Sequence, residues 1–172
     1  LSTAGTVFIN SDDAGSGSIT FNGTGSFTIN AVNAIASATS VVVNGATLNV
    51  ASNDTVAGVQ LLSGAISGST LTSTSTFDLQ SGAVSANLAG SVGLTKSTSG
   101  TVILTGGNSY TGTTTVSAGV LQVSNNTASG NLGPGPIVDN ATLFFNYNVS
   151  WTFNRAVSGT GILQLSASAG AL

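Results

Sequence analysis

Residues Leu94 to Val123 read LTKSTSGTVILTGGNSYTGTTTVSAGVLQV. In this stretch, short runs of alternating apolar and hydroxyl residues are separated by glycine and asparagine. Alternation with a period of two is typical of a half-buried β-strand, and glycine and asparagine are typical of the turns between strands. The stretch therefore predicts short strands joined by tight corners.

The same pattern continues along the whole chain, and Gly, Asn and Pro separate the apolar runs throughout. No segment shows a sustained helical period, and Ala31–Thr39 is the one weak exception. The predicted strands are Thr6–Ile9, Ser18–Phe21, Ser26–Ile29, Val41–Val43, Thr47–Val50, Val59–Leu62, Thr76–Leu79, Val102–Leu104, Thr114–Val116, Val120–Val123, Thr142–Phe145, Trp151–Phe153 and Ile162–Leu165.

Many short strands fit either an antiparallel sandwich or a solenoid of stacked parallel strands. Internal repetition favours the solenoid. The segment Gly100–Leu104 recurs in altered form as Gly159–Leu165, and Gly45–Val50 recurs as Ala118–Val123 and as Asn140–Phe145. A single coil of such a solenoid cannot offset the entropy of ordering its backbone, so the coils must stack on one another.

The opening stretch also resembles the passenger-associated strand repeat of bacterial autotransporters. A weaker likeness extends from about Thr76 to Leu165, and the departure at Ser97–Ser99, where the family usually carries a glycine, affects one turn. The resemblance implies a secreted parallel β-helix with a surface or extracellular structural role. The residues that carry it are Leu94-Thr95-Lys96, Gly100-Thr101, Leu104, Gly106, Asn108, Tyr110-Thr111-Gly112, Thr114, Val116, Gly119, Leu121 and Val123.

Together these features predict an all-β fold, a single-stranded right-handed parallel β-helix. With about 20–25 residues in each coil, the chain makes about seven or eight coils. Residues 1–172 are expected to form one continuous β-helix segment, with the family-like repeat strongest at 76–165.

The composition restricts the possible functions. Charged residues make up 4% of the 172 residues, against roughly 25% in an average domain. A net charge of −3 with two cations predicts no nucleic-acid partner. The absence of Cys rules out disulfides, and no run of 18 apolar residues predicts a membrane span. Because the sequence starts at Leu1, we interpret it as a mature product or an excised part of a longer chain.

Acidic residues offer little for catalysis. Asp12 and Asp13 form the one acidic pair, and neighbours on an extended chain point to opposite faces, which suits a glycosidase poorly. We interpret this pair as part of a solvated loop, with a calcium site as the alternative. His and Cys, the usual bases and nucleophiles, are absent. No catalytic, metal or cofactor site is therefore predicted, and no enzymatic activity.

Other polar and aromatic residues have a structural and a functional interpretation. For Lys96 and Arg155 we favour a charge at a strand edge or corner that discourages lateral pairing over a ligand contact. Asn108 is expected to turn inward or to cap a corner with its amide, and Tyr110 to pack over that corner. Ligand binding by Asn108 and Tyr110 is the alternative.

The segment 142–153 alternates strictly. Leu143, Phe145, Tyr147, Val149, Trp151 and Phe153 are expected to face the interior, although a corner near Asn146–Asn148 interrupts the run. Phe144 then lies on the outer face, where it is a candidate for lateral contact with another chain.

These features predict a structural segment of a secreted, autotransporter-like protein at the bacterial surface or outside the cell, forming a rod or fibre. Its partners would be copies of itself docked end to end or the flanking coils of a longer chain. The candidate self-association residues lie in the end coils: Val7, Ile9, Ile162, Leu163 and Leu165. The alternative is an adhesin module whose Ser/Thr/Asn-rich face binds glycans or a host surface.

Overall fold

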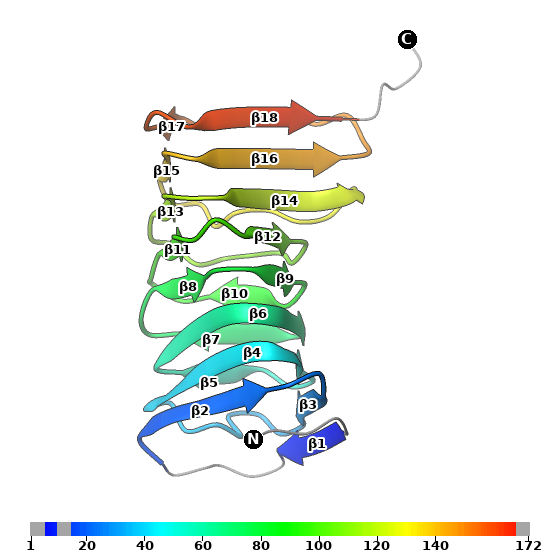
Figure 1. Ribbon diagram of the computed structural model, residues 1–172, viewed down its shortest axis with the longest axis vertical. Coiled ribbons are helices and arrows are strands. Elements are labelled where there is room, and N and C mark those ends of the chain that lie inside the picture. Colours follow the sequence, from blue (N-terminus) through cyan, green and yellow to red (C-terminus); the bar gives the residue numbers. More distant parts are fainter. Residues whose placement is uncertain (1–5, 10–14, 168–172) are drawn as a thin grey trace.

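Parallel strands pile up into a β-solenoid in the computed structural model (Figure 1). The structure describes residues 6–9 and 15–167, and every regular element within these ranges is a β-strand. The strands stack along one long axis in about eight turns (Figure 1). The predicted all-β parallel solenoid is therefore confirmed.

Each turn contributes strands to two main faces, and two long strands run around the corner between them. The corner-spanning strands are β4 (Thr39–Val50) and β6 (Gly58–Gly68). The first face contains β2 (Gly17–Asn22), β8 (Phe77–Leu79), β11 (Leu94–Lys96), β13 (Thr114–Val116), β15 (Ile137–Asp139) and β17 (Val157–Ser158). The second face contains β1 (Thr6–Ile9), β3 (Ser26–Ile29), β9 (Gly82–Val84), β12 (Thr101–Leu104), β14 (Val120–Thr127), β16 (Thr142–Tyr147) and β18 (Ile162–Ser166).

A third, shorter face consists of β5 (Asp54–Val56), β7 (Thr70–Ser73) and β10 (Asn87–Ala89). All strand pairs in the described residues are parallel, which rules out the antiparallel sandwich. Val41 pairs with Val59, and Leu121 pairs with Leu143, so a turn takes 18 to 22 residues at these points. This coil is slightly shorter than expected because several corners are made by one or two residues.

The core is a set of columns in which each inward side chain contacts its equivalent one turn away. The longest column on the second face is in register through eight strands, from β3 to β18. Its members up to Phe145 are at most 4% exposed. The column runs through Phe27, Leu48, Ile66, Val84, Leu104, Val123, Phe145 and Leu165.

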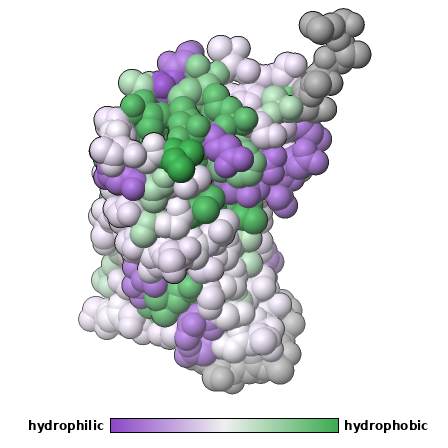
Figure 2. All heavy atoms as spheres, turned by 45° about the horizontal axis from the view of Figure 1, so that its top comes forward, coloured by the Kyte–Doolittle hydropathy of each residue, from purple (hydrophilic) through white to green (hydrophobic). Residues whose placement is uncertain are grey.

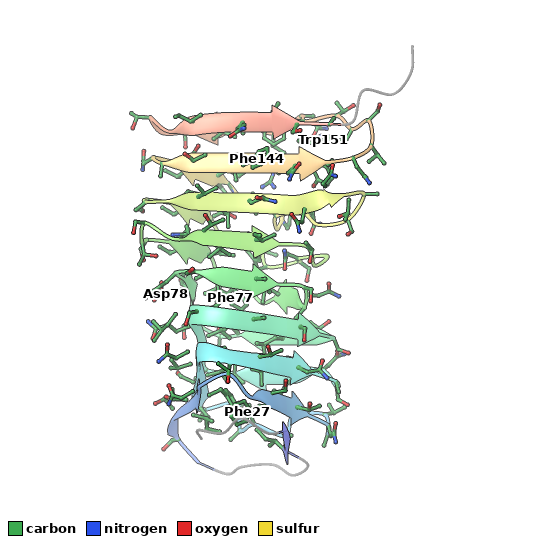
Figure 3. The ribbon with its side chains drawn as sticks, turned by 45° about the vertical axis from the view of Figure 1, so that its right-hand side comes forward. Phe27, Phe77, Asp78, Phe144 and Trp151 are labelled. Atoms are coloured by element: carbon green, nitrogen blue, oxygen red, sulfur yellow. The ribbon has the colours of Figure 1, made fainter. Side chains whose placement is uncertain are left out.

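Aromatic rings fill the wider parts of this core. Phe21 and Phe27 lie with their ring centroids 5.0 Å apart, and Phe77 lies 6.0 Å from Tyr110. Phe27 and Phe77 are fully buried (Figure 3). Burial of such rings contributes a large share of the hydrophobic stabilisation of a thin solenoid.

Several predicted elements differ from the structure. The runs Val41–Val43 and Thr47–Val50 belong to the single strand β4. Ala31–Thr39 forms turns, and no helix is present in the described residues. Seven strands of two to four residues were not predicted, because so few residues carry no readable alternation: β5, β7, β9, β10, β11, β15 and β17.

The predicted strand Trp151–Phe153 is wrong, since residues 149–156 contain no strand. Ring packing positions this segment instead. Trp151 and Phe153 lie 5.2 Å and 5.0 Å from the ring of Phe145. In the part of the chain that the structure describes, no helix is long and apolar enough to cross a membrane.

Candidate functional site

Lys96 is fully buried, although it is one of only two cations in the chain. It ends β11 with its side chain turned inward. Its Nζ donates to the Thr98 carbonyl, to Thr98 Oγ1 at 3.2 Å and to the Ala118 carbonyl at 3.2 Å. Because Ala118 belongs to the following turn, the ammonium group links two coils at their corner.

Burial lowers the pKa of Lys96, and the nearby Asp78 carboxylate acts in the opposite direction. Three oxygen acceptors and this carboxylate compensate for the loss of water around the ammonium group. A buried lysine cannot repel a neighbouring molecule, so the prediction that Lys96 discourages lateral pairing is wrong. The side chain is equally unable to contact an external ligand.

Asn108 connects three successive turns through its amide. Its Oδ1 accepts a hydrogen bond from the Leu88 N–H at 2.9 Å, and its Nδ2 donates to the Asn131 carbonyl at 2.7 Å. Nδ2 also lies 3.3 Å from the carbonyl of Gly106, within its own turn. The prediction that Asn108 turns inward and caps a corner is confirmed, since its side chain is 3% exposed.

Tyr110 is fully buried beside this corner. Its hydroxyl lies 2.7 Å from Thr114 Oγ1, and burial raises the pKa of the phenol. Neither Asn108 nor Tyr110 presents a surface to a ligand. Their polar groups bond within the solenoid and set the shape of the corner.

Glycines of the same motif allow neighbouring turns to approach closely. A Cβ on Gly106 would lie 2.1 Å from the carbonyl oxygen of Ala86, and a Cβ on Gly119 would lie 2.3 Å from that of Gly100. Gly119 also has a φ of +68°, which disfavours other residues. The glycine positions of the motif are thus fixed by contact with the preceding turn.

Asp78 forms the centre of a polar cluster on the outer side of the first face (Figure 3). Its Oδ2 accepts hydrogen bonds from Gln60 Nε2 at 2.7 Å and from Gln80 Nε2 at 2.9 Å. Ser97 Oγ lies 3.5 Å from Oδ1. Since Gln60 and Ser97 lie on the turns before and after, the cluster links adjacent coils through side chains as well as backbone.

Arg155, the second cation, is half-buried in the segment between β16 and β17. Its Nη2 donates to the carbonyl of Gly135, one turn earlier. A cavity of about 510 Å³ lies beside it, lined by residues 134–137 and 155–158.

The inward and outward sets predicted for segment 142–153 are only partly correct. Leu143, Phe145 and Tyr147 are buried as expected. Val149 is 41% exposed, because the chain turns at Asn148 and loses the alternation of β16. Phe144 points outward and is half-buried between Gln122 and Gln164 of the neighbouring strands (Figure 3). Its lateral contact with another chain stays a prediction.

Apolar side chains are exposed on the last described turn. Ile162, Leu163 and Leu165 of β18 are 64%, 39% and 53% exposed. Figure 2 shows apolar residues gathered at this end of the molecule. At the opposite end, Ile9 of β1 is partly buried against the core, and among the described strands β1 pairs only with β3. The side chain of Val7 lies outside the described residues, as do Asp12 and Asp13.

No group of three or more Asp, Glu, His or Cys side chains lies close enough to hold a metal ion in residues 6–9 and 15–167. The polar groups that the structure buries instead bond to neighbouring coils, as Lys96 and Asn108 do. The candidate functional feature of the described residues is the contact between neighbouring coils.

Comparison with known proteins agrees with this geometry. Residues 94–123 match the family model of the passenger-associated-transport-repeat. An alignment with the Adhesin BmaC autotransporter of Brucella suis biovar 1 (strain 1330) shows 34% identity over 82 residues. It covers 43% of this chain and 2% of the adhesin. No solved structure matches the chain.

The chain is a parallel β-solenoid, and a stretch near its middle carries the motif of a passenger repeat. Residues 94–123 of this solenoid are an autotransporter passenger repeat. The matched residues include the buried Lys96, the bridging Asn108 and the close-packed Gly106 and Gly119. Each of these residues contacts a neighbouring coil, so the motif consists largely of residues that coil stacking requires.

Proposed function

We propose that this chain is a structural segment of a longer extracellular protein, a rod whose coils continue beyond β18. The observation that carries the proposal is the column that ends at Leu165. Its equivalents Val123 and Phe145 are at most 4% exposed, whereas Leu165 is 53% exposed. One further parallel coil would cover it as each coil covers the one before.

A further coil would also use the hydrogen-bonding groups of β18. Within residues 6–9 and 15–167, this strand pairs with β16 on one side only and stands last in the order of the sheet. An edge strand of this kind is a template for another strand. The added coil comes either from flanking sequence of the parent chain or from a second copy docked end to end.

The role is structural rather than catalytic in this proposal, and its location is outside the cell or at the bacterial surface. Support comes from the passenger repeat and from the adhesin relative. Further support comes from the buried polar residues Lys96 and Asn108, whose donors and acceptors serve neighbouring coils.

End-to-end docking of copies can be tested with two substitutions in the same strand. Leu165→Asp places a charge on the axis, and Gln164→Asp places the same charge on the exposed outer side. We expect wild type and the Gln164→Asp variant to associate with increasing concentration in sedimentation and to form rods by electron microscopy, and Leu165→Asp to stay monomeric.

A monodisperse wild-type monomer at high concentration, with no rods, would argue against docking of copies. Covalent continuation would then be examined in the parent protein, whose mass under denaturing conditions reports whether further coils belong to the same chain. A parent chain whose sequence contains no further coils would contradict covalent continuation.

A second candidate function is adhesion through the Ser/Thr/Asn-rich outer face. The observation that favours it is the likeness to a protein named as an adhesin. A glycan array with the purified segment tests it, and uniform lack of binding would count against this function while leaving the rod proposal intact.

A further inference from the structure

The outward side chains at the centre of the second face form a continuous row along the solenoid. This row alternates with the buried column that contains Leu48, Leu104 and Phe145, so its side chains point away from the core. Each member pairs in register with its equivalent one turn away. The members of this outer row are Thr47, Ala65, Ala83, Ile103, Gln122, Phe144 and Gln164.

Five consecutive members of the outer row expose mainly carbon. Four of the five, from Ala65 to Phe144, are apolar. Gln122 is the fifth, and its amide is used within its own strand: Nε2 donates to the Ser124 carbonyl at 2.9 Å and to Asn125 Oδ1 at 3.2 Å. We call residues 65, 83, 103, 122 and 144 the apolar strip.

No charged residue lies in any described strand of the second face, including β4 and β6. The charged side chains of the described residues lie elsewhere. Asp54, Lys96 and Asp139 are buried, Asp78 lies on the outer side of the first face, and Arg155 lies in the segment 149–156. Removing a charge from water is far more costly than covering apolar or hydroxyl groups. Another protein surface can therefore cover the apolar strip without removing a charge of this chain from water.

The apolar strip is low at one end and high at the other. Ala65 and Ala83 each carry one methyl group, whereas Ile103, Gln122 and Phe144 carry long side chains. A two-fold axis that runs along β12 places the high half of one strip on the low half of an identical strip. We propose that the apolar strip binds a second copy of this chain in this antiparallel arrangement. Across the interface, Phe144 then contacts Ala65, Gln122 contacts Ala83 and Ile103 contacts its own counterpart.

The size of the outer row makes this association weak. Seven strands at about 4.8 Å, each contributing about four residues at about 3.3 Å, make a face of roughly 30 Å by 13 Å. Two such faces bury less than the roughly 1,200 Å² of a standard interface, which is the range of weak and transient association. We therefore expect dimers at the concentrations used for nuclear magnetic resonance, above those of the end-to-end sedimentation test.

This lateral association goes beyond the rod function and does not rest on it. The residues from Ala65 to Phe144 precede the last described turn and lie on the side of the solenoid, so a further coil stacked on β18 leaves the strip free. The Leu165→Asp variant is the background for every measurement, because its axial charge blocks end-to-end docking. Association that persists in this background is lateral.

The Ala83→Asp substitution tests the strip directly. Ala83 is exposed, so the change leaves the core intact, but in the dimer it buries a carboxylate without a partner. Thr115→Asp adds the same charge on the outer side of the first face and is the matched control. Amide shifts along the strip should move with dilution in the background protein and in the control. In Ala83→Asp the dissociation constant should rise at least about tenfold, with an unchanged melting temperature.

A second substitution tests the antiparallel arrangement. Position 83 of one copy faces position 122 of the other only if the two copies run antiparallel. An equal mixture of Ala83→Asp and Gln122→Lys should therefore associate at least as tightly as the background protein, whereas each variant alone should be about tenfold weaker. In a parallel arrangement the two new charges do not face each other, and the mixture stays weaker than the background protein.

Amide shifts that do not change with dilution, together with the tumbling time of a monomer, would overturn the proposal. So would equal weakening by Ala83→Asp and Thr115→Asp, since net charge rather than the strip would then control association. A mixture that stays weaker than the background protein would reject the antiparallel contact. None of these results bears on end-to-end docking, which the sedimentation of wild type and Leu165→Asp measures separately.

Discussion

At the scale of single residues, polar side chains inside this solenoid act between turns. Asn108 contacts the backbone of the turn before it and of the turn after it, and Lys96 bonds the corner of the following turn. A buried amide or ammonium group costs stability unless it is bonded, and bonded in this way it fixes one register. The residues of the passenger motif therefore fix the register between neighbouring coils in addition to favouring their stacking.

We predict that Asn108→Ala destabilises the protein by about 2 kcal/mol or more. The buried Leu88 N–H and the partly buried Asn131 carbonyl both lose the amide, and a buried group left unpaired costs about 1–3 kcal/mol. Urea unfolding measures the loss, and hydrogen exchange at the Leu88 amide should accelerate. Asn125→Ala, at an exposed position, is the matched control and should change stability by less than about 0.5 kcal/mol. Equal stability of the two variants would contradict the bridging role.

Lys96 predicts a pH dependence of stability. Its pKa is lower in the folded protein than the ordinary 10.5, so between these two values the unfolded chain binds more protons. The free energy of unfolding should therefore rise as pH increases through the window just below 10.5. Buried tyrosines with raised pKa, Tyr110 and Tyr147, act in the opposite direction above about pH 10.

The difference between wild type and Lys96→Met isolates the lysine, because both proteins share the tyrosines. Urea unfolding at a series of alkaline pH values measures it. The stability of wild type should increase relative to the variant as pH rises through this window. A difference that stays constant with pH would contradict the lowered pKa.

At the scale of elements, the distance between neighbouring turns is set at corners where a glycine of one turn packs against the backbone of the turn beside it. Gly106 and Gly107 are adjacent in sequence but differ in their surroundings. A Cβ on Gly106 would lie 2.1 Å from the Ala86 carbonyl oxygen, whereas a Cβ on Gly107 would lie 3.4 Å from the Asn87 side chain, at ordinary contact distance. Only the first position brings the corner of one turn directly against the backbone of another.

We therefore predict that Gly106→Ala costs about 1–3 kcal/mol or more, the usual range for overpacking, and that Gly107→Ala stays within about 1 kcal/mol of wild type. Thermal unfolding followed by circular dichroism compares the two variants directly. Similar melting temperatures for the two variants would mean that the turns can move apart at Gly106 without loss of stability. That result would contradict the close contact between Gly106 and the preceding turn.

At the scale of the whole molecule, the near absence of charge leaves two sites for trypsin, after Lys96 and after Arg155. Lys96 is fully buried in β11, whereas Arg155 lies in the segment 149–156 that contains no strand. Proteases cut where the backbone opens locally. The structure therefore ranks the two sites.

We predict that trypsin acting on the folded protein cuts after Arg155 before it cuts after Lys96. Mass spectrometry of a time course identifies the fragments, and the Arg155→Gln variant should resist cleavage for much longer than wild type. Early cleavage after Lys96 would show that the central turns open more readily than the segment near the exposed end.

Much of this architecture can be predicted from the sequence. Alternation of apolar and hydroxyl residues with glycine corners is a local property, and internal repetition turns it into a parallel stack, so the solenoid and most strands of the second face follow directly. The prediction that Asn108 turns inward or caps a corner came from its place in the glycine- and asparagine-rich corner of the motif. Seven of the shortest strands, among them β5, β7 and β10, were not predicted, because their residues are extended through pairing with neighbouring turns rather than through a pattern of their own.

The sequence by itself determined the type of fold. Strand alternation and corner residues are local signals, and short strands that alternate in this way bury their apolar side by stacking coil on coil. The tertiary structure decided the rest. It turned Lys96 inward, where the Thr98 carbonyl of its own corner is joined by the Ala118 carbonyl once the next turn is in place. It held Trp151 and Phe153 by ring packing on Phe145 where the alternation predicted a strand, and it left Leu165 exposed at the end of a buried column. The positions of Lys96 and Leu165 depend on residues about twenty places away, and those of Trp151 and Phe153 on ring packing across a turn, neither of which strand alternation records.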